Sequence, residues 1–177
     1  MLIDAGGRVV YADEEPGDRD IDGILWERWG GTATGPSMWA EHHPLRQRHV
    51  MDHRPRCAMC GGEPDRDEQG VLWLLEADAA QQPLTFPLDI ITTTPPVCRE
   101  DGRRALRECP VLREEAIAVR VRDAELVGVR GTVYSRTAPP QAGQTVLFTD
   151  DAIHRVVASQ LLRELRGAVR DDVTLAC

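Results

Sequence analysis

Two short apolar runs predict a pair of neighbouring strands. The first is VLWLL at 71–75, and the second is the β-branched and apolar stretch LTFPLDIITTT at 84–94. The polar segment DAAQQP lies between them and is typical of a loop. We therefore expect residues 71–75 and 84–94 to form a β-hairpin.

Alternating apolar and polar positions predict further strands in the second half of the chain. The alternation is clear at 116–122 and 125–135, and a third short strand is expected at 145–150. Gly128 and Gly131 interrupt the second strand and are typical of bulges or of close backbone approach. These segments predict a small antiparallel sheet.

A helical pattern dominates the C-terminal part of the chain. Within 151–167, Ile153, Val157, Leu161 and Leu165 recur at four-residue spacing, which is typical of an amphipathic helix. Val156 extends the same apolar stripe. Asp150 or Asp151 suits the N-cap, and Gly167 suits the C-terminal end. We expect this helix to pack on the small sheet with Leu161 buried.

Three shorter helical segments are predicted upstream. Residues 45–53 can form one helix after Pro44, which suits a first helical position. Ser37 is a candidate N-cap for a separate short helix that contains Glu41. In GILWERWGG, Trp26 and Trp29 are three residues apart, so they would share one face of a helical turn and serve packing.

The composition limits the compartment and the partners. The chain has 177 residues and a net charge of -8, so no overall electrostatic field attracts nucleic acid. An acidic segment occupies residues 1–22, and it is expected to be solvated and partly mobile. The start has no basic, apolar signal pattern, and no apolar run is long enough to span a membrane, which favours a cytoplasmic protein. The absence of Lys and Asn is typical of a GC-rich genome, such as that of an actinobacterium.

The stretch CAMCGG at 57–62 carries the clearest chemical signal. In a cytoplasmic protein, the pair Cys57 and Cys60 favours metal or redox chemistry over a structural disulfide. A thioredoxin-like pair would stand at a helix start after a strand, whereas this pair precedes two glycines, which favours a zinc knuckle. A redox pair and incidental thiols remain the alternatives. Cys109 and Cys177 are more typical of incidental thiols.

A further cysteine stands at a predicted helix start. TTTPPVCRED ends a strand with two prolines, and a helix is expected from Cys98 onward. Helix starts offer free amide donors and a positive dipole end, and both favour a thiolate.

The order of knuckle, β-hairpin and helix start over residues 57–101 resembles the treble-clef zinc finger. In that family, the second ligand pair comes from the first turn of the helix, usually as another Cys-x-x-Cys. The corresponding stretch here is CRED, in which Asp101 stands where the second cysteine is expected. The chain also resembles a group of uncharacterised actinobacterial proteins, some of them phage-related, and that resemblance implies no activity.

The fourth zinc ligand is open between three residues and a solvent molecule. Cys98 and Asp101 are three apart, so they share a helix face and can converge on one ion. Cys109 is eleven residues from Cys98, about 16 Å along a continuous helix, whereas zinc-bound sulfurs lie within about 4 Å of each other. A break at Gly102 would bring Cys109 back, and His53 is the remaining alternative. We expect zinc bound by Cys57, Cys60, Cys98 and Asp101.

These patterns predict one α+β domain over residues 1–177. After the acidic segment 1–22, a treble-clef-like zinc module is expected at 45–112, followed by strands and the C-terminal helix at 113–177. The predicted function is that of a binding or adaptor protein with structural zinc and an unidentified protein or small-molecule partner.

An enzyme is the first alternative to the adaptor. With Cys57, Cys60 and Cys98 as the only ligands, zinc would keep an open position. His49 and His53 would then lie beside it, and Glu41 or Asp52 would act as a base. An HNH-like nuclease is less favoured, because no histidine lies between residues 53 and 154, and Asp89 alone would not supply its site.

A nucleic-acid-binding zinc finger is the second alternative. Four arginines precede and flank the knuckle: Arg46, Arg48, Arg54 and Arg56. Three more lie on the helix after Cys98: Arg103, Arg104 and Arg107. Phosphate contacts would favour such a patch. Acidic residues are interleaved with these arginines, however, which favours intramolecular ion pairs or solvation.

Overall fold

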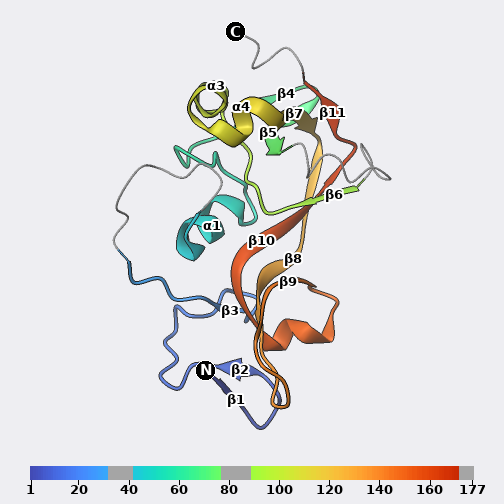
Figure 1. The fold of residues 1–177 in the computed structure, drawn as a ribbon. Helices are drawn as coiled ribbons and strands as arrows, with labels where there is room; N and C mark the ends of the chain where they lie inside the picture. The colour runs from blue at the N-terminus through green and yellow to red at the C-terminus, as the bar shows by residue number, and fades with distance from the viewer. Residues whose placement is uncertain (32–41, 77–88, 172–177) are drawn as a thin grey trace.

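The computed structural model describes residues 1–31, 42–76 and 89–171 as an α+β fold with three small sheets (Figure 1). The helices are α1 (Pro44–Met51), α3 (Arg99–Glu108), α4 (Pro110–Glu115) and the short 3-10 helix η1 (Asp151–Arg155). The first six strands are β1 (Leu2–Ile3), β2 (Val9–Val10), β3 (Leu25–Trp26), β4 (Arg66–Asp67), β5 (Gly70–Glu76) and β6 (Asp89–Thr92). The others are β7 (Ala116–Val121), β8 (Asp123–Val133), β9 (Gln141–Leu147), β10 (Val156–Arg166) and β11 (Val169–Arg170).

The long antiparallel pair β8 and β10 forms the middle of the five-stranded sheet, in the order β3-β10-β8-β9 with β6 also on β10. The pair runs from the lower part of the molecule toward the end that carries α3 (Figure 1). Two register shifts break it, between Ala158 and Gln160 and between Leu162 and Arg163. Gly128 and Gly131 lie beside these shifts, where a Cβ would stand 2.3 and 2.1 Å from backbone oxygens. The prediction of close approach at both glycines is confirmed.

Helix α1 closes a gap along the edge of β10. Strand β3 pairs with the first part of that edge and β6 with the last part, which leaves the middle without a strand partner. Gln47 of α1 fills this gap, because its Oε1 accepts from Leu161 N at 2.8 Å and its Nε2 donates to Thr93 O at 2.8 Å. Gln47 is buried, so these hydrogen bonds satisfy polar atoms that water does not reach.

A buried arginine holds the C-terminal end of α1. The Arg163 guanidinium donates to Met51 O at 3.1 Å and to Asp52 O at 2.6 Å, so it satisfies carbonyls at the helix C-terminus. It also donates to the carbonyl of Ala124. Burial lowers the pKa of Arg163, but the carbonyl contacts compensate its charge. Helix α1 is thereby attached to the five-stranded sheet through its middle and through its C-terminal end.

The four-stranded sheet, in the order β11-β7-β5-β4, separates two hydrophobic clusters. Val71, Trp73 and Leu75 of β5 pack in the larger cluster, together with residues of β8, β10 and α1. Leu72 and Leu74 point the other way, into a smaller cluster beside α3 and α4. This is the alternation expected of a strand that is buried on both faces.

Arg120 of β7 is the buried polar centre of this sheet. Its guanidinium pairs with Asp65 at 2.5 Å, Asp171 at 2.7 Å and Asp67 at 3.2 Å. Burial alone would lower its pKa, but the hydrogen bonds from Arg120 to Asp65 and Asp171 raise the pKa overall. These carboxylates connect β7 to the turn before β4 and to the residue after β11. The network fixes the backbone around Asp65, which also contacts the start of the α3 segment.

The predicted C-terminal helix at 151–167 is wrong. Only Asp151–Arg155 is helical, as a 3-10 turn, and Val156–Arg166 is the central strand β10. The bulge between Ala158 and Gln160 lengthens the spacing of buried apolar residues from two residues to three, from Ala158 to Leu161. The apolar positions of this strand therefore resemble those of a helix. Leu161 is buried as expected, with 4% of its surface exposed, but it is buried as a strand residue.

The predicted hairpin of 71–75 with 84–94 is also wrong. Strand β5 pairs with β4 and β7, whereas β6, the described part of 84–94, pairs with β10 in another sheet. The sequence between them lies largely outside the described residues. Because both strands are apolar, their pattern does not distinguish between these partners.

The helical turn predicted at Trp26 and Trp29 is replaced by strand β3. Trp26 is buried and donates through Nε1 to Asp20 at 2.9 Å. Trp29 is partly exposed and stacks on His43, with ring centroids 4.3 Å apart. Packing is thus the role of Trp26, as expected.

Several other elements lie where the local sequence pattern predicted them. Helix α1 (Pro44–Met51) overlaps the helix predicted at 45–53, α3 begins after Cys98, and β7 and β8 match the two alternating segments. The predicted strand at 145–150 overlaps β9, which begins earlier and ends at Leu147. No helix in the described ranges is long and apolar enough to cross a membrane. Three residues of the sequence predictions lie outside the described part: Ser37, Glu41 and Cys177.

The acidic N-terminal segment makes specific ion pairs. Asp18 is buried and accepts from Arg28 at 2.6 Å, and Glu14 accepts from Arg19 at 2.7 Å. The hydrogen bond from Arg28 lowers the pKa of Asp18 to about 2. Part of the negative charge in this segment is therefore neutralised within the fold.

Candidate metal centre

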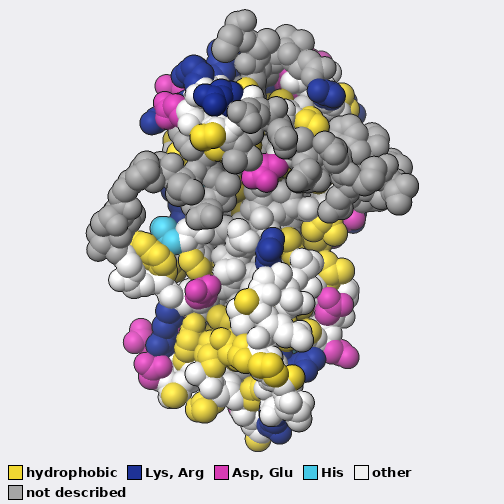
Figure 2. Space-filling view, in the orientation of Figure 1, with side chains coloured by type: hydrophobic (Ala, Val, Ile, Leu, Met, Phe, Trp, Pro, Cys, Tyr) yellow, Lys and Arg dark blue, Asp and Glu magenta, His cyan; other side chains and the backbone are white. Residues whose placement is uncertain are grey.

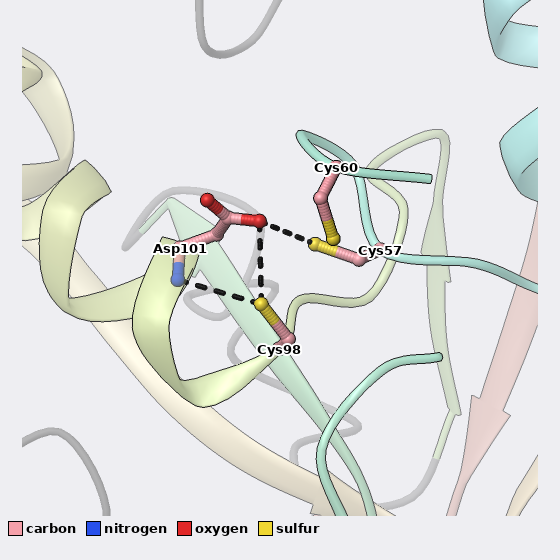
Figure 3. Close-up of side chains that lie close together, drawn as sticks. All are labelled: Cys57, Cys60, Cys98 and Asp101. Carbon is pink, nitrogen blue, oxygen red and sulfur yellow. Dashed lines mark hydrogen bonds between the residues drawn. The ribbon is translucent and has the colours of Figure 1, made fainter. Parts of the chain in front are cut away.

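Four side chains converge between the loop before β4 and the start of α3 (Figure 3). Cys57 and Cys60 come from the loop, and Cys98 and Asp101 come from the helix start. One ligand atom from each residue, three sulfurs and a carboxylate oxygen, lies within 4.8 Å of every other. This group could hold a metal ion.

The knuckle turn follows from the two glycines after Cys60. Gly61 has φ +72°, a left-handed conformation that side chains disfavour, and its N–H donates to Cys57 O at 3.0 Å. Cys57 N donates to Gly62 O at 2.8 Å and closes the turn. Gly62 N also approaches the Cys60 sulfur, at 3.4 Å. The turn thus holds both sulfurs on one side of the loop.

The helix start is equally well defined. Cys98 is the N-cap of α3, with an extended backbone, and its sulfur accepts from Asp101 N at 3.5 Å. The helix is continuous through Gly102, whose N–H donates to Cys98 O at 2.9 Å. Cys98 and Asp101 therefore point to the same side, as residues three apart in a first helical turn do.

Three backbone hydrogen bonds hold these segments against each other and against β5. Ala58 N donates to Pro96 O at 2.8 Å, which ties the knuckle to the chain before α3. Val97 N donates to Leu72 O at 3.0 Å, and Asp65 N donates to Val97 O at 3.0 Å. The positions of the ligands therefore depend on the sheet and on the Asp65 region as well as on the two local turns.

A single carboxylate oxygen joins two of the thiols. The sulfurs of Cys57 and Cys98 donate to Asp101 Oδ2 at 3.1 and 3.2 Å. Burial raises the pKa of Cys98 to about 12, and burial also raises the pKa of Cys57. Burial would raise the pKa of Asp101 too, but hydrogen bonds from the thiols outweigh it and the pKa is lowered. A bound divalent ion would take the place of these shared protons, because metals bind the thiolate form.

The donor set suits a soft or borderline metal. Three sulfurs with one carboxylate oxygen are typical of zinc and other thiophilic ions, whereas calcium and magnesium require oxygen donors. Bonds of about 2.3 Å in a tetrahedron place ligand atoms about 3.8 Å apart. The four ligand atoms, all within 4.8 Å of one another, are close to this spacing.

The other predicted ligands lie outside this group. Cys109 is the C-cap of α3, at the far end of the helix, and is buried in the smaller hydrophobic cluster. His53 is exposed and lies 3.7 Å from Asp52. Asp52 and His53 line a separate cavity of about 220 Å³, together with Arg48. His49 is exposed as well, so the histidines proposed for a catalytic zinc are not gathered around the cysteines.

The arginines of the predicted nucleic-acid patch make contacts within the protein. Arg46 donates to Met59 O at 2.8 Å and to Ala58 O at 3.2 Å, and Arg56 lies 3.4 Å from Gly61 O. Arg48 lies over the Trp26 ring, and Arg54 is exposed. Near α3, basic and acidic side chains are interleaved on the surface (Figure 2). Arg104 pairs with Glu108 at 3.0 Å there.

Two residues that contact the knuckle, His42 and Arg46, were not assigned to it in the sequence predictions. His42 Nε2 lies 3.0 Å from Ala58 O, so it carries the proton in this contact, because a carbonyl only accepts. Burial lowers the pKa of His42. Arg46 was assigned to phosphate contacts instead. Their spacing before Cys57 gives no local signal, since the contacts span a loop of more than ten residues.

Comparisons of the chain with protein-family models, with curated proteins and with solved structures found no match. The function is therefore inferred from the chemistry of the site.

Proposed function

We propose that the protein binds one zinc ion through Cys57, Cys60, Cys98 and Asp101, and that the ion has a structural role in a binding or adaptor module. The proposal rests on the convergence of four ligand atoms within 4.8 Å from two segments far apart in the chain. Four protein ligands complete a tetrahedron, which is the usual composition of a structural zinc site.

The composition of the surroundings supports a structural role. In the part of the chain that the structure describes, the buried side chains of the smaller cluster beside the site are small or aliphatic: Ala58, Leu72, Leu74, Val97, Ala105, Cys109 and Leu112. Neither the knuckle nor residues 97–98 belong to a strand or helix. Metal binding would therefore supply the cross-link that these segments otherwise lack, as it does in small zinc domains.

The chain order favours a treble-clef-like module. The knuckle at 57–62 precedes the short β4–β5 hairpin, and α3 starts at the second ligand pair. This hairpin takes the place of the one predicted from the sequence. Asp101 takes the place of the second helix cysteine, and its oxygen is a normal zinc donor.

An adaptor is favoured over an enzyme by the position of the candidate bases. A catalytic zinc needs an open coordination position with a proton acceptor nearby. Asp52, His53 and His49 extend from the C-terminal part of α1, and the first two line a different cavity. The site thus offers four ligands and places these groups elsewhere.

Metal analysis of the purified protein tests the proposal. We expect about one zinc per chain, and cobalt substitution should give the charge-transfer absorption of thiolate ligands. Cys57→Ser should lose the metal, whereas Cys109→Ser, which removes a buried cysteine outside the group, should keep it. Metal-free wild-type protein that neither binds added zinc nor changes in stability would contradict the proposal.

A further inference from the structure

Arg46 contacts the backbone of the knuckle. Its guanidinium donates to two successive carbonyls, Met59 O at 2.8 Å and Ala58 O at 3.2 Å. It is partly buried, and His42 shares the Ala58 oxygen. Arg46 thus holds two consecutive peptide groups of the turn that carries Cys57 and Cys60.

The N–H groups of the same two peptides point away from Arg46. In a trans peptide the C=O and the N–H point in opposite directions. The amide partners of Ala58 O and Met59 O belong to Met59 and Cys60, and these two backbone N–H groups act to lower the pKa of Cys57, against the larger effect of burial. Arg46 therefore holds the carbonyl ends of two peptide groups whose N–H ends favour the thiolate form of Cys57.

Gly61 makes this approach of Arg46 feasible. A Cβ at position 61 would lie 3.0 Å from Nη1 and 3.3 Å from Nη2 of Arg46. The positive φ of Gly61 independently disfavours a side chain there. The glycine after Cys60 thus serves both the turn and the seating of the arginine.

Charge gives a second reason for a cation at this position. Three thiolates and one carboxylate carry more negative charge than a divalent ion neutralises. A guanidinium that polarises the peptide groups toward the sulfur offsets part of this excess in a partly buried site. Arg48, one residue beyond Gln47 on the same helix, lies instead over the Trp26 ring, at 5.8 Å.

We propose that Arg46 is a positioning residue of the metal centre, which orients the Ala58 and Met59 peptide groups so that their amides stabilise the Cys57 thiolate. This inference rests on the proposed zinc site. It assigns Arg46 a role within the protein in place of the predicted phosphate contact.

Zinc affinity measured by competition with a chromophoric chelator tests this role. Arg46→Ala should weaken zinc binding by about 10- to 100-fold, the range typical of residues that orient metal ligands. Arg46→Lys keeps the positive charge but loses the planar guanidinium that donates to both carbonyls. Its zinc affinity should therefore lie between those of Arg46→Ala and the wild type. Arg48→Ala, which removes the same side chain from the same helix, should leave the affinity unchanged.

Cobalt spectra separate positioning from a general loss of stability. Arg46→Ala should shift the sulfur-to-cobalt charge-transfer band, because the Cys57 sulfur loses oriented amide donors, whereas Arg48→Ala should not. If Arg46→Ala lies largely unfolded without metal, Arg46→Lys and Arg46→Gln provide the same comparison in folded protein.

Wild-type affinity and an unshifted spectrum in the Arg46 variants would overturn the assignment, even if their melting temperature fell. An equal loss in Arg48→Ala would also overturn it. Failure of the wild-type protein itself to bind zinc or cobalt would refute the metal site and this inference together, and the first measurement reveals that outcome.

Discussion

The two hydrophobic clusters of this protein are held together by different means. The larger one lies between the two main sheets and α1, and it buries two tryptophans, Trp26 and Trp73, with many branched side chains. Among the described residues, the smaller one, beside the cysteines, buries Ala, Val, Leu and Cys side chains and no aromatic one. Because hydrophobic stabilisation grows with the apolar area buried, the smaller cluster contributes much less.

Buried polar groups follow the same division. At the larger cluster, Gln47 and Arg163 connect α1 to the sheet through hydrogen bonds that leave few polar atoms unpaired. At the smaller cluster, the sulfurs and Asp101 meet between segments without regular structure. The comparison teaches that one part of the fold is stabilised by packing, whereas the other brings together four side chains that could bind a metal ion.

Loss of the metal should have the largest effect and should be confined to the smaller cluster. In Cys57→Ser or chelated protein, we expect α3 and the knuckle to lose protection from hydrogen exchange, while β8 and β10 keep it. Structural zinc contributes about 10 kcal/mol or more in zinc-finger peptides, which indicates the scale. Exchange measured by mass spectrometry provides the check, with Cys109→Ser as control. Equal loss of protection in both regions would contradict the division.

Truncation in the larger cluster should destabilise the protein without releasing metal. Leu161 of β10 is 4% exposed, and Leu161→Ala should cost about 2–5 kcal/mol through lost contacts and a cavity. Denaturant unfolding of zinc-loaded protein measures this cost. Ile91→Ala, on the neighbouring strand β6 and 39% exposed, should cost much less. A negligible effect at Leu161 would be incompatible with a central buried strand.

The polar contact in the gap along β10 should have a smaller effect. Gln47→Ala leaves Leu161 N–H and Thr93 O without their partner in a buried place, which should cost about 1–3 kcal/mol. Chemical unfolding is again the measurement. Gln144→Ala, an exposed glutamine with a local contact to Ala142 O, is the matched control. Similar stabilities of the two variants would show that the gap is solvated.

Substitution of Asp101 should sharpen the assignment of the ligands. Asp101→Ala should weaken zinc binding by about tenfold or more, equivalent to about 1.4 kcal/mol. Asp101→Cys should tighten it with the fold retained, because thiolate is a softer zinc ligand. Chelator competition measures both variants. Unchanged affinity in Asp101→Ala would remove Asp101 from the ligand set.

The acidic N-terminal segment should give the smallest effect, far from the metal. Arg28 lowers the pKa of Asp18 to about 2 from an ordinary value of 3.8, so this ion pair stabilises the fold above about pH 4. Its contribution is lost as the pH falls through about 2. Asp18→Asn should lower the melting temperature at pH 7, and the difference from wild type should shrink between pH 4 and 2. Asp13→Asn, whose exposed carboxylate also pairs with Arg28, should show little change.

Residues close together in the chain could be interpreted from the sequence. Pro44 predicted the start of α1, and the glycines after Cys60 predicted a tight turn. Cys98 and Asp101, three apart at a helix start, were expected on one side, and they lie there together. These features depend on backbone conformation and on short-range hydrogen bonds, which the identities of a few neighbouring residues determine.

Pairing between distant segments was decided only by the tertiary structure. The apolar positions of β10 resembled those of a helix, because its bulges change the two-residue period of a strand. Strands β5 and β6 are both apolar, so their sequences do not show that β5 pairs with β7 and β6 with β10. The contact of Arg46 with the knuckle also escaped prediction, since its charge alone suggested phosphate. The sequence by itself determined two local pairs, Cys57 with Cys60 and Cys98 with Asp101, and the turns that present them, because each pair lies within a few residues. The tertiary structure brings the two pairs together. The partners of each strand and of Arg46 depend on packing across the whole fold, and no short pattern encodes that.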